Sequence, residues 1–251
     1  MAVSAGDGDG PPWFVAPAFG SRLVHFDSTD STNDRLRALA GEGAENGTVV
    51  TAAEQSAGRG RHGRRWSAPP GSAFLFSGLL RPLDLRHLML PLAVPLAVCD
   101  AVEQLAPLEC AVKWPNDIWV AERKLAGILI EARPPEWAVI GVGINLSVAD
   151  DEFPSDLRWP ATSVGRGVEP EAMLNVLCLA LDRWVVASDA EVRAEFARRD
   201  ALRGREISWS GAGEGSGTAA GIDERGNLQV ALEGGETVAL GSGEVSLRLH
   251  R

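Results

Sequence analysis

The hydrophobic pattern of the first 200 residues alternates between two kinds of segment. Short apolar runs rich in β-branched residues predict strands, and longer runs with helical spacing predict helices. The predicted strands are residues 22–27, 48–54, 73–80, 109–114, 124–132 and 137–146. The predicted helices are residues 31–40, 86–105, 169–186 and 189–201, with Pro91 and Pro95 in the first turns of the second one. Strands this apolar suit a sheet that helices cover.

The pattern changes after Gly204, where short strand-like runs alternate with turn signals. Strands are predicted at residues 207–209, 217–222, 228–232, 237–240 and 245–249. Such closely spaced strands are typical of a small all-β barrel. We therefore divide the chain into a larger domain at 21–203 and a small C-terminal domain at 204–251. The Gly-, Pro- and Ala-rich residues 1–20 predict a flexible N-terminal tail.

Composition narrows the class of protein. The chain has 251 residues, 45% of them hydrophobic, and a net charge of −10. That charge argues against a general nucleic-acid binder, which needs a broad basic face. Cys99, Cys110 and Cys178 lie in apolar segments without a CxxC spacing, which indicates reduced core residues of a cytoplasmic protein. Neither a signal peptide nor a membrane-spanning run is visible, so we expect no membrane partner.

A basic loop at residues 58–66 is the local exception to the acidic charge. It holds four arginines and three glycines. Glycine lets a backbone approach a ligand closely, and arginine presents a planar fork of donors to carboxylates and phosphates. The loop therefore predicts an anion site. A solvated flexible loop and an RNA-binding Gly/Arg segment are the alternatives, and the absence of a GxxxxGK[ST] motif excludes a P-loop.

Three further segments carry polar residues at chain corners. Small polar residues at 30–33 stand where a strand gives way to a helix, so they can bind a polar ligand or simply cap the helix. The run KWPNDIW at 113–119 predicts a turn with Asn116 and Asp117 at its tip, and Lys124 begins the returning strand. In GVGINL at 141–146, glycines inside a strand predict close approach by a ligand or a second backbone.

Taken together, these segments resemble the biotin–protein ligase family. The matching pieces are Ser31-Thr-Asn33, Gln55 with the loop GRGRHGRRW, KWPNDIW, KLAGILIE and GVGINL. The resemblance covers residues 22–250. It implies an enzyme that uses ATP and Mg²⁺ to activate biotin as biotinyl-5′-AMP. A lysine of a biotin carboxyl carrier domain, in an acyl-CoA or pyruvate carboxylase, then receives the biotin.

The resemblance also assigns roles to residues of this chain. Positions that match the biotin pocket are Ser31, Thr32, Asn33, Gln55, Arg59, Gly60, Arg61 and Lys124. Positions on the ATP and adenylate side are Arg61, Trp66, Asn116 and Asn145, with Asp117 as the magnesium ligand. Arg61 and Lys124 are the predicted catalytic cations, because no protein nucleophile is needed and the task is to position anions and neutralise charge.

The fold implied is α+β. It is a mixed sheet flanked by helices, related to lipoate ligases and class II synthetase-like folds, with an SH3-like β-barrel at the C-terminus. Some family members carry an N-terminal winged helix-turn-helix and repress transcription. Only about twenty residues precede the first predicted strand, fewer than three helices need, so we expect no DNA binding. Family members range from monomers to dimers linked to ligand binding, so a homodimer stays open.

Two alternatives remain at this stage. A lipoate or octanoate ligase would share the fold and the lysine before a strand, although such enzymes lack the arginine loop and KWPND as written here. An RNA-binding module would use the Gly/Arg loop with tryptophan stacking, against the acidic net charge.

Overall fold

The computed structural model describes residues 19–247 other than 156, 158, 212 and 242. Residues 1–18 of the tail predicted at 1–20 therefore lie outside the described residues. Phe19 is buried, and its N–H donates to Oδ1 of Asp182 at 3.0 Å. Residue 19 is thus packed against the body of the protein.

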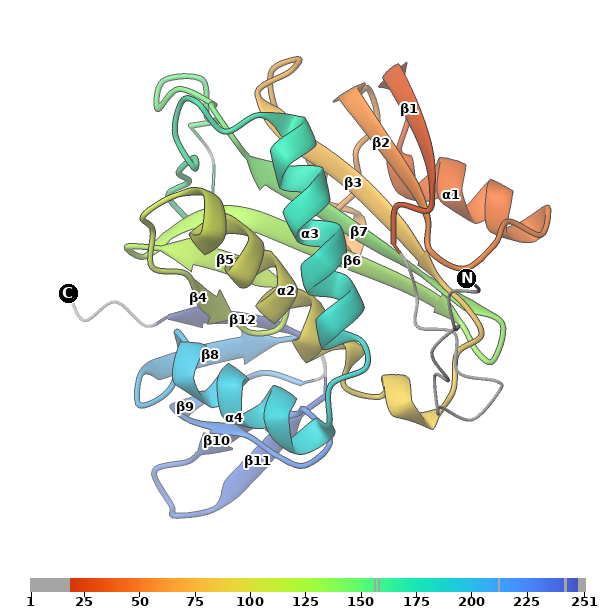
Figure 1. The fold of residues 1–251 in the computed structure, drawn as a ribbon. Coiled ribbons are helices and arrows are strands. Elements are labelled where there is room, and N and C mark those ends of the chain that lie inside the picture. The colour runs from red at the N-terminus through yellow and green to blue at the C-terminus, as the bar shows by residue number, and fades with distance from the viewer. Residues whose placement is uncertain (1–18, 156, 158, 212, 242, 248–251) are drawn as a thin grey trace, which may run out of the picture.

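A seven-stranded sheet forms the centre of the larger part (Figure 1). Its strands, in spatial order, are β1 (Arg22–Thr29), β2 (Thr48–Gln55), β3 (Ala73–Leu80), β7 (Trp137–Asn145), β6 (Arg123–Arg133), β5 (Asp117–Val120) and β4 (Ala111–Lys113). The β1–β2 pair is parallel, and every other neighbouring pair is antiparallel. The sheet is mixed, which confirms the predicted fold class.

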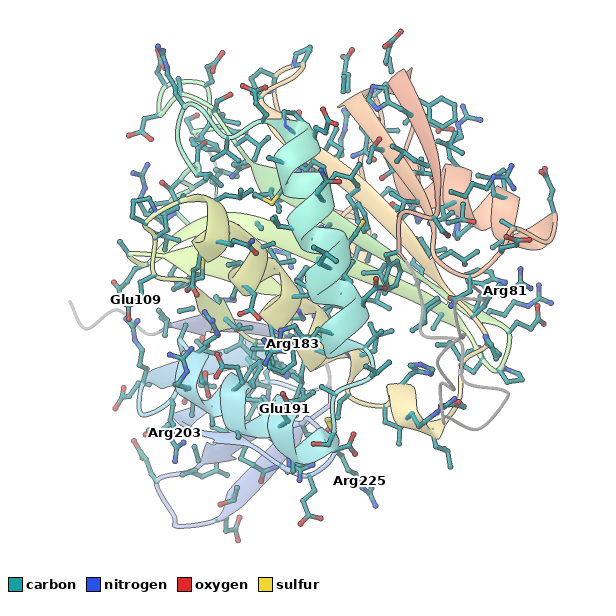
Figure 2. The ribbon with its side chains drawn as sticks, viewed as in Figure 1. Arg81, Glu109, Arg183, Glu191, Arg203 and Arg225 are labelled. Atoms are coloured by element: carbon teal, nitrogen blue, oxygen red, sulfur yellow. The ribbon has the colours of Figure 1, made fainter. Side chains whose placement is uncertain are left out.

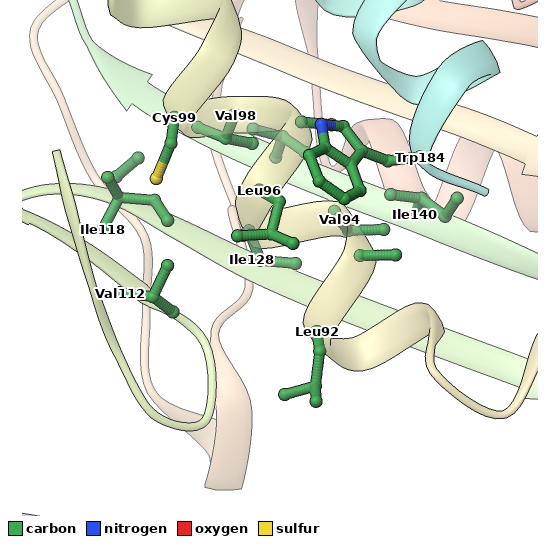
Figure 3. Close-up of a cluster of buried hydrophobic side chains, with 14 of the residues drawn as sticks. Leu92, Val94, Leu96, Val98, Cys99, Val112, Ile118, Ile128, Ile140 and Trp184 are labelled. Atoms are coloured by element: carbon green, nitrogen blue, oxygen red, sulfur yellow. The ribbon is translucent and has the colours of Figure 1, made fainter. Parts of the chain in front are cut away.

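Helices cover both faces of this sheet because its strands alternate apolar side chains between two cores. On β3, Phe74 and Phe76 join the large core that includes helix α2 (Leu90–Leu105) and helix α3 (Pro170–Trp184). Leu79 joins a smaller cluster with Leu36 of helix α1 (Thr32–Gly41). Figure 3 shows the large core between α2 and the strands. Helix α1 therefore packs on the face opposite α2 and α3.

The C-terminal part is a five-stranded antiparallel sheet, consistent with the predicted SH3-like domain. Its strands are β8 (Glu206–Ser210), β9 (Gly215–Ile222), β10 (Leu228–Ala231), β11 (Thr237–Leu240) and β12 (Glu244–Leu247). Helix α4 (Asp189–Arg199) links it to the larger part. Figure 2 labels Arg183 and Glu191, which form a 3.5 Å ion pair from the neighbouring ends of α3 and α4. Buried residues of this sheet belong to the same core cluster as α2, so the two parts pack together without a gap in the core.

Two predicted elements were wrong in detail. The sequence predicts a turn at 113–119, but residues 117–120 form the strand β5. It ends at a second turn in which Ala121 and Glu122 have φ of 47° and 63°, and neither residue type signals positive φ. The helix predicted at 86–105 begins at Leu90, after a separate 3₁₀ turn, Leu85–His87. With this later start Pro91 lies in the first turn of α2, and Pro95 lies inside the helix.

Candidate active site

A cleft of about 690 Å³ opens on the sheet face that α1 only partly covers. Small residues hollow this face. Leu75, Gly143, Gly127 and Asp117 are successive partners across β3, β7, β6 and β5, so their Cβ positions share one face. In the neighbouring row, Gly141 pairs with Ser77 and Leu129. Where large side chains would have filled the space, the glycines leave room for a ligand and for side chains from the loops.

Every site residue predicted from the sequence lines this one cleft. They come from five separate segments of the chain and are Ser31, Thr32, Asn33, Gln55, Arg59, Gly60, Arg61, Trp66, Asn116, Asp117, Lys124 and Asn145. The structure thus brings together the residues to which the resemblance assigned roles. The individual roles remain predictions.

One wall of the cleft is a network of hydrogen bonds at the start of α1. Oε1 of Gln55 accepts from the backbone N–H of Thr32 at 2.7 Å and lies 3.1 Å from its hydroxyl. The hydroxyls of Thr32 and Ser77 are 2.8 Å apart, and Ser77 donates to Oδ1 of Asn33 at 2.6 Å. Ser31 precedes the helix as its N-cap but makes no side-chain capping bond. This wall presents fixed amide and hydroxyl groups, which suits a neutral polar ligand head.

The basic loop closes on itself beside this wall. The N–H of Trp66 donates to the carbonyl of Gly58 at 3.0 Å, and the N–H of Gly60 donates to that of Arg64 at 2.8 Å. At its tip His62 has φ of 55°, in the left-handed region that asparagine, aspartate and histidine tolerate better than most residues. The loop therefore carries its arginines on a short, hydrogen-bonded hairpin.

Trp66 lies over the glycines of the sheet. A Cβ on Gly143 would meet Cε2 of Trp66 at 2.5 Å, and one on Gly127 would meet Cζ3 at 3.0 Å. The glycines of GVGINL were expected to admit a ligand or a second backbone. At Gly143 it is the Trp66 indole that approaches, and at Gly141 it is the Asn33 carboxamide.

The turn of KWPND supplies the opposite wall. Asn116 is held by β6, because its Nδ2 donates to the carbonyl of Ile128 at 3.1 Å. Nη1 of Arg61 donates to Oδ1 of Asn116 at 3.4 Å. The ammonium of Lys124 forms a 2.7 Å ion pair with Oδ1 of Asp117 and lies 5.8 Å from the Trp66 ring centroid. The two predicted catalytic cations thus contact adjacent residues, 116 and 117.

The electrostatics of the cleft suit an anionic ligand. Arg59 forms ion pairs with Glu131 at 2.5 Å and with Asp34 at 2.9 Å. Among the residues that the structure describes, Nε of Arg59 and Nε1 of Trp66 are buried donors without a hydrogen-bond partner. A buried donor without a partner costs free energy, so a ligand oxygen that accepts from it binds more tightly. The arrangement can hold an anion and neutralise added negative charge.

Glu131 stays charged in this setting. Burial alone would raise the pKa of its carboxyl, but hydrogen bonds from Arg59 and Asn33 and the charges of Arg59 and Arg37 lower it. For Arg59, burial would lower the pKa of the guanidinium, and the hydrogen bond and charge of Glu131 outweigh this and raise it. Each partner therefore keeps the other ionised.

Comparison with known proteins decides the family. Residues 25–145 match the biotin/lipoate A/B protein ligase family, and residues 209–248 match the biotin protein ligase C-terminal domain. A biotin–[acetyl-CoA-carboxylase] ligase of Mycobacterium tuberculosis is 35% identical over 86% of this chain and 85% of its own. One of Paracoccus denitrificans is 37% identical over 80% of this chain and 90% of its own. The chain belongs to the biotin–protein ligase family.

A solved member of the biotin–protein ligase family shares the fold. The Aquifex aeolicus enzyme, determined in complex with biotin and ATP, is 29% identical to this chain. It covers 91% of this chain and 99% of its own, with a TM-score of 0.75. In the described part of the chain, no helix is long and apolar enough to span a membrane.

Sequence reasoning assigned no role to three residues in or beside the cleft of this biotin–protein ligase. Lys113 lines the cleft and is only 5% exposed, with its ammonium 5.7 Å and 5.9 Å from the ring centroids of Trp119 and Trp159. Ser77 and Glu131 hold the polar wall without having been assigned a role. A lone hydroxyl within the apolar run 73–80 and a charge ending the run 124–131 were the available signals.

Proposed function

We propose that this protein is an ATP-dependent ligase that activates biotin as biotinyl-5′-AMP and transfers it to a lysine of a biotin carboxyl carrier domain. The observation that carries the proposal is the convergence of Arg61 and Lys124 on Asn116 and Asp117 in one cleft. The names of the relatives and the bound ligands of the Aquifex aeolicus enzyme support it. A lipoate or octanoate ligase and an RNA-binding module are not favoured.

In the first half-reaction a carboxylate oxygen of biotin attacks the α-phosphorus of ATP. The bond from that phosphorus to the bridging oxygen breaks, and pyrophosphate leaves. Negative charge from both substrates is then crowded around one phosphorus. We assign its neutralisation to the Arg61 guanidinium and the Lys124 ammonium, which both line the cleft.

In the second half-reaction the ε-amine of the carrier lysine attacks the acyl carbon of the mixed anhydride. AMP leaves with the electron pair of the broken bond, and the amine loses a proton as the amide forms. The adenylate is prone to hydrolysis, so water must be excluded until the lysine arrives. We assign this to the basic loop at 58–66, ordering over the bound adenylate with Trp66 against the adenine.

We infer that Asp117 would hold Mg²⁺ together with phosphate oxygens of ATP. The described residues contain no group of three His, Cys, Asp or Glu side chains that could hold a metal by themselves. Mg²⁺ commonly takes one or two protein carboxylates and completes its shell with substrate phosphates and water, so a single cleft carboxylate fits. The ion would neutralise phosphate charge.

Asn145 is the weaker of the residues that we assign to the nucleotide side. Its Nδ2 donates to the carbonyl of Thr162 at 3.0 Å.

The partner is inferred from the relatives. The name of the Mycobacterium tuberculosis protein refers to acetyl-CoA carboxylase, so we propose a carboxylase carrier domain as the acceptor. Three free, buried thiols suit a reducing compartment, and we place the reaction in the cytoplasm. A homodimer linked to ligand binding remains a prediction, and sedimentation with and without biotin and ATP tests it.

Transfer of labelled biotin tests the proposed function. The purified protein is incubated with ATP, Mg²⁺, radiolabelled biotin and a biotin carrier domain, and the label retained by the carrier is counted. A carrier whose acceptor lysine is changed to arginine is the control. Label transfer to the intact carrier alone supports the proposal. Lipoate transferred in preference to biotin, or no transfer of either, would contradict it.

A further inference from the structure

Glu131, the last residue of the KLAGILIE segment within strand β6, connects the polar wall of the cleft to the basic loop. Its Oε2 accepts from Nδ2 of Asn33 at 2.9 Å and from Nη2 of Arg59 at 2.5 Å. Its Oε1 accepts from Nη1 of Arg37 at 3.1 Å. We propose that Glu131 is a positioning residue that orients Asn33 in the biotin pocket and anchors Arg59, so that pocket and loop are held in one arrangement. This inference rests on the proposed function.

Glu131 fixes which way the Asn33 carboxamide faces. Nδ2 of Asn33 donates to Glu131 and to the carbonyl of Leu129 at 3.2 Å, which leaves its Oδ1 to accept from Ser77. A flipped carboxamide would place its oxygen against these two acceptors, so the carboxylate disfavours it. The carboxamide also fills the space above Gly141, where a Cβ would overlap its atoms. Asn33 is thus held in one orientation, and Glu131 supplies the charged contact.

The orientation of Asn33 passes to the rest of the pocket. Ser77 donates to Asn33 and lies 2.8 Å from the hydroxyl of Thr32, and Thr32 in turn contacts Gln55. Each hydroxyl has a single proton, so its direction depends on its neighbour. Loss of the charge on Glu131 therefore changes the donor pattern that the pocket presents to biotin. Glu131 acts through Asn33 and does not itself line the cleft.

The second contact of Glu131 holds the base of the loop. Arg59 reaches across the cleft edge to Glu131, which is 72 residues away in sequence, and the same Nη2 lies 2.9 Å from Asp34. Asp34 also pairs with Arg37, so it is shared. A neutral residue at 131 leaves Arg59 with only this shared carboxylate. The loop is then held less firmly over a bound adenylate, and the adenylate escapes faster.

The test compares Glu131→Gln, which keeps the shape and removes the charge, with Glu136→Gln as the matched control. Glu136 lies in the turn after β6 and pairs only with Arg133 at 3.3 Å among its described contacts. For E131Q we expect the KM for biotin to rise about tenfold, since one charge-assisted hydrogen bond is lost, while the KM for the carrier stays at the wild-type value. Release of free biotinyl-5′-AMP should also rise about fivefold. The control should match the wild type in all three.

A second variant, Asp34→Asn, tests the Arg59 contact separately from the Asn33 contact. It also provides a test if E131Q folds poorly. Asp34 contacts Arg59 but not Asn33, so this variant should release adenylate faster and should raise the KM for biotin less than E131Q does. Melting temperatures are recorded for all variants. The inference is overturned if E131Q keeps wild-type KM for biotin and adenylate release, or if Asp34→Asn leaves release unchanged. A wild-type protein that makes no biotinyl-5′-AMP would instead overturn the proposed function, and the inference with it.

Discussion

Arg199 and Arg59 each lie among carboxylates, yet they differ in solvent exposure and in how many of their nitrogens are paired. The Arg199 side chain is 7% exposed, and its Nε, Nη1 and Nη2 all contact acidic side chains. The Arg59 side chain is 35% exposed, and its Nε has no hydrogen-bond partner among the described residues. All three guanidinium nitrogens of Arg199 are thus paired with acidic side chains of the protein. In Arg59, which lies beside the cleft, Nε remains a donor without an acceptor in the described part of the chain.

The difference separates a structural cluster from a functional one. Asp100 and Glu103 on α2 and Glu195 on α4 surround Arg199, which also donates to the carbonyl of Cys110 at 3.4 Å just before β4. The cluster ties two helices to the sheet edge, and burial opposes but does not outweigh the carboxylates that raise the pKa of Arg199. The Arg59 cluster joins only chain segments that border the cleft. The fully paired guanidinium of Arg199 indicates a packing role, and the unpaired Nε of Arg59 beside the cleft indicates a ligand.

The largest expected effect is on the Arg199 cluster. Arg199→Met removes two ion pairs from partly buried carboxylates, leaving Asp100 with Arg183 and the Trp184 N–H and Glu103 with the Cys110 N–H. This should lower the free energy of unfolding by about 3 kcal/mol, the low end for breaking a buried pair. Urea unfolding measures it. Arg198→Met on the same helix is the control, because Arg198 is 67% exposed and its loss should cost less than about 1 kcal/mol. An equal loss of unfolding free energy in the two variants would show that Arg199 has no special structural role.

The cleft should respond in activity instead. Lys124→Ala removes a charge from the reaction centre, and we expect kcat for pyrophosphate release with biotin to fall about 10²- to 10³-fold. The melting temperature should stay within a few degrees of the wild type, because the Lys124–Asp117 pair is partly open to solvent. Wild-type pyrophosphate release by this variant would remove Lys124 from the mechanism.

A smaller effect, on the KM for ATP, tests whether the packing of Trp66 against Gly143 matters for nucleotide binding. Gly143→Ala places a methyl group against the indole, so Trp66 must move and the KM for ATP should rise about tenfold. Gly234→Ala is the control, since a Cβ there meets nothing within 4 Å. If the two variants bind ATP equally well, Trp66 does not form part of the nucleotide site.

Acid should loosen the Arg199 cluster. Hydrogen bonds from Arg198 outweigh burial and, with Arg199, lower the pKa of Glu195 to about 2. A lowered pKa in the folded state means that the contribution to stability is complete above the pKa of the unfolded state, and is lost as the pH falls toward 2. The free energy of unfolding should therefore drop less between pH 5 and pH 3 in Glu195→Gln than in the wild type. Parallel pH profiles would show that Glu195 contributes nothing.

The smallest effect is expected at the rim of the cleft. Arg37 pairs with Asp34 and Glu131 but is 40% exposed, and such surface pairs contribute little. Arg37→Ala should change the KM for biotin less than about threefold. A larger change, measured in the same assay as E131Q, would mean that Arg37 and not Arg59 is the important partner of Glu131.

Much of the site could be predicted from the sequence because its residues are unusual where they stand. Arginines between glycines and a lysine opening an apolar strand have few structural reasons to be there. The strands and helices followed from hydrophobic periodicity in the same way. What failed was local: β5 is four residues long, and its closing turn uses Ala121 and Glu122, which carry no turn signal.

Other site residues were invisible because their meaning depends on distant partners. Glu131 resembles any charge that ends a strand until Asn33, 98 residues earlier, is placed beside it. Ser77 resembles a neutral position in an apolar strand until it is seen between Thr32 and Asn33. The order of strands in the sheet brings these residues together, and periodicity along the chain does not encode that order.

A double-mutant cycle on adenylate formation tests the central claim, that Arg61 and Lys124 neutralise the same developing charge. Rapid-quench single turnovers measure biotinyl-5′-AMP formed by the wild type, Arg61→Ala, Lys124→Ala and the double variant at saturating biotin and ATP. Residues that act as a unit are not additive, so the double variant should lose little more than the worse single variant. A double loss equal to the product of the single losses would contradict the account.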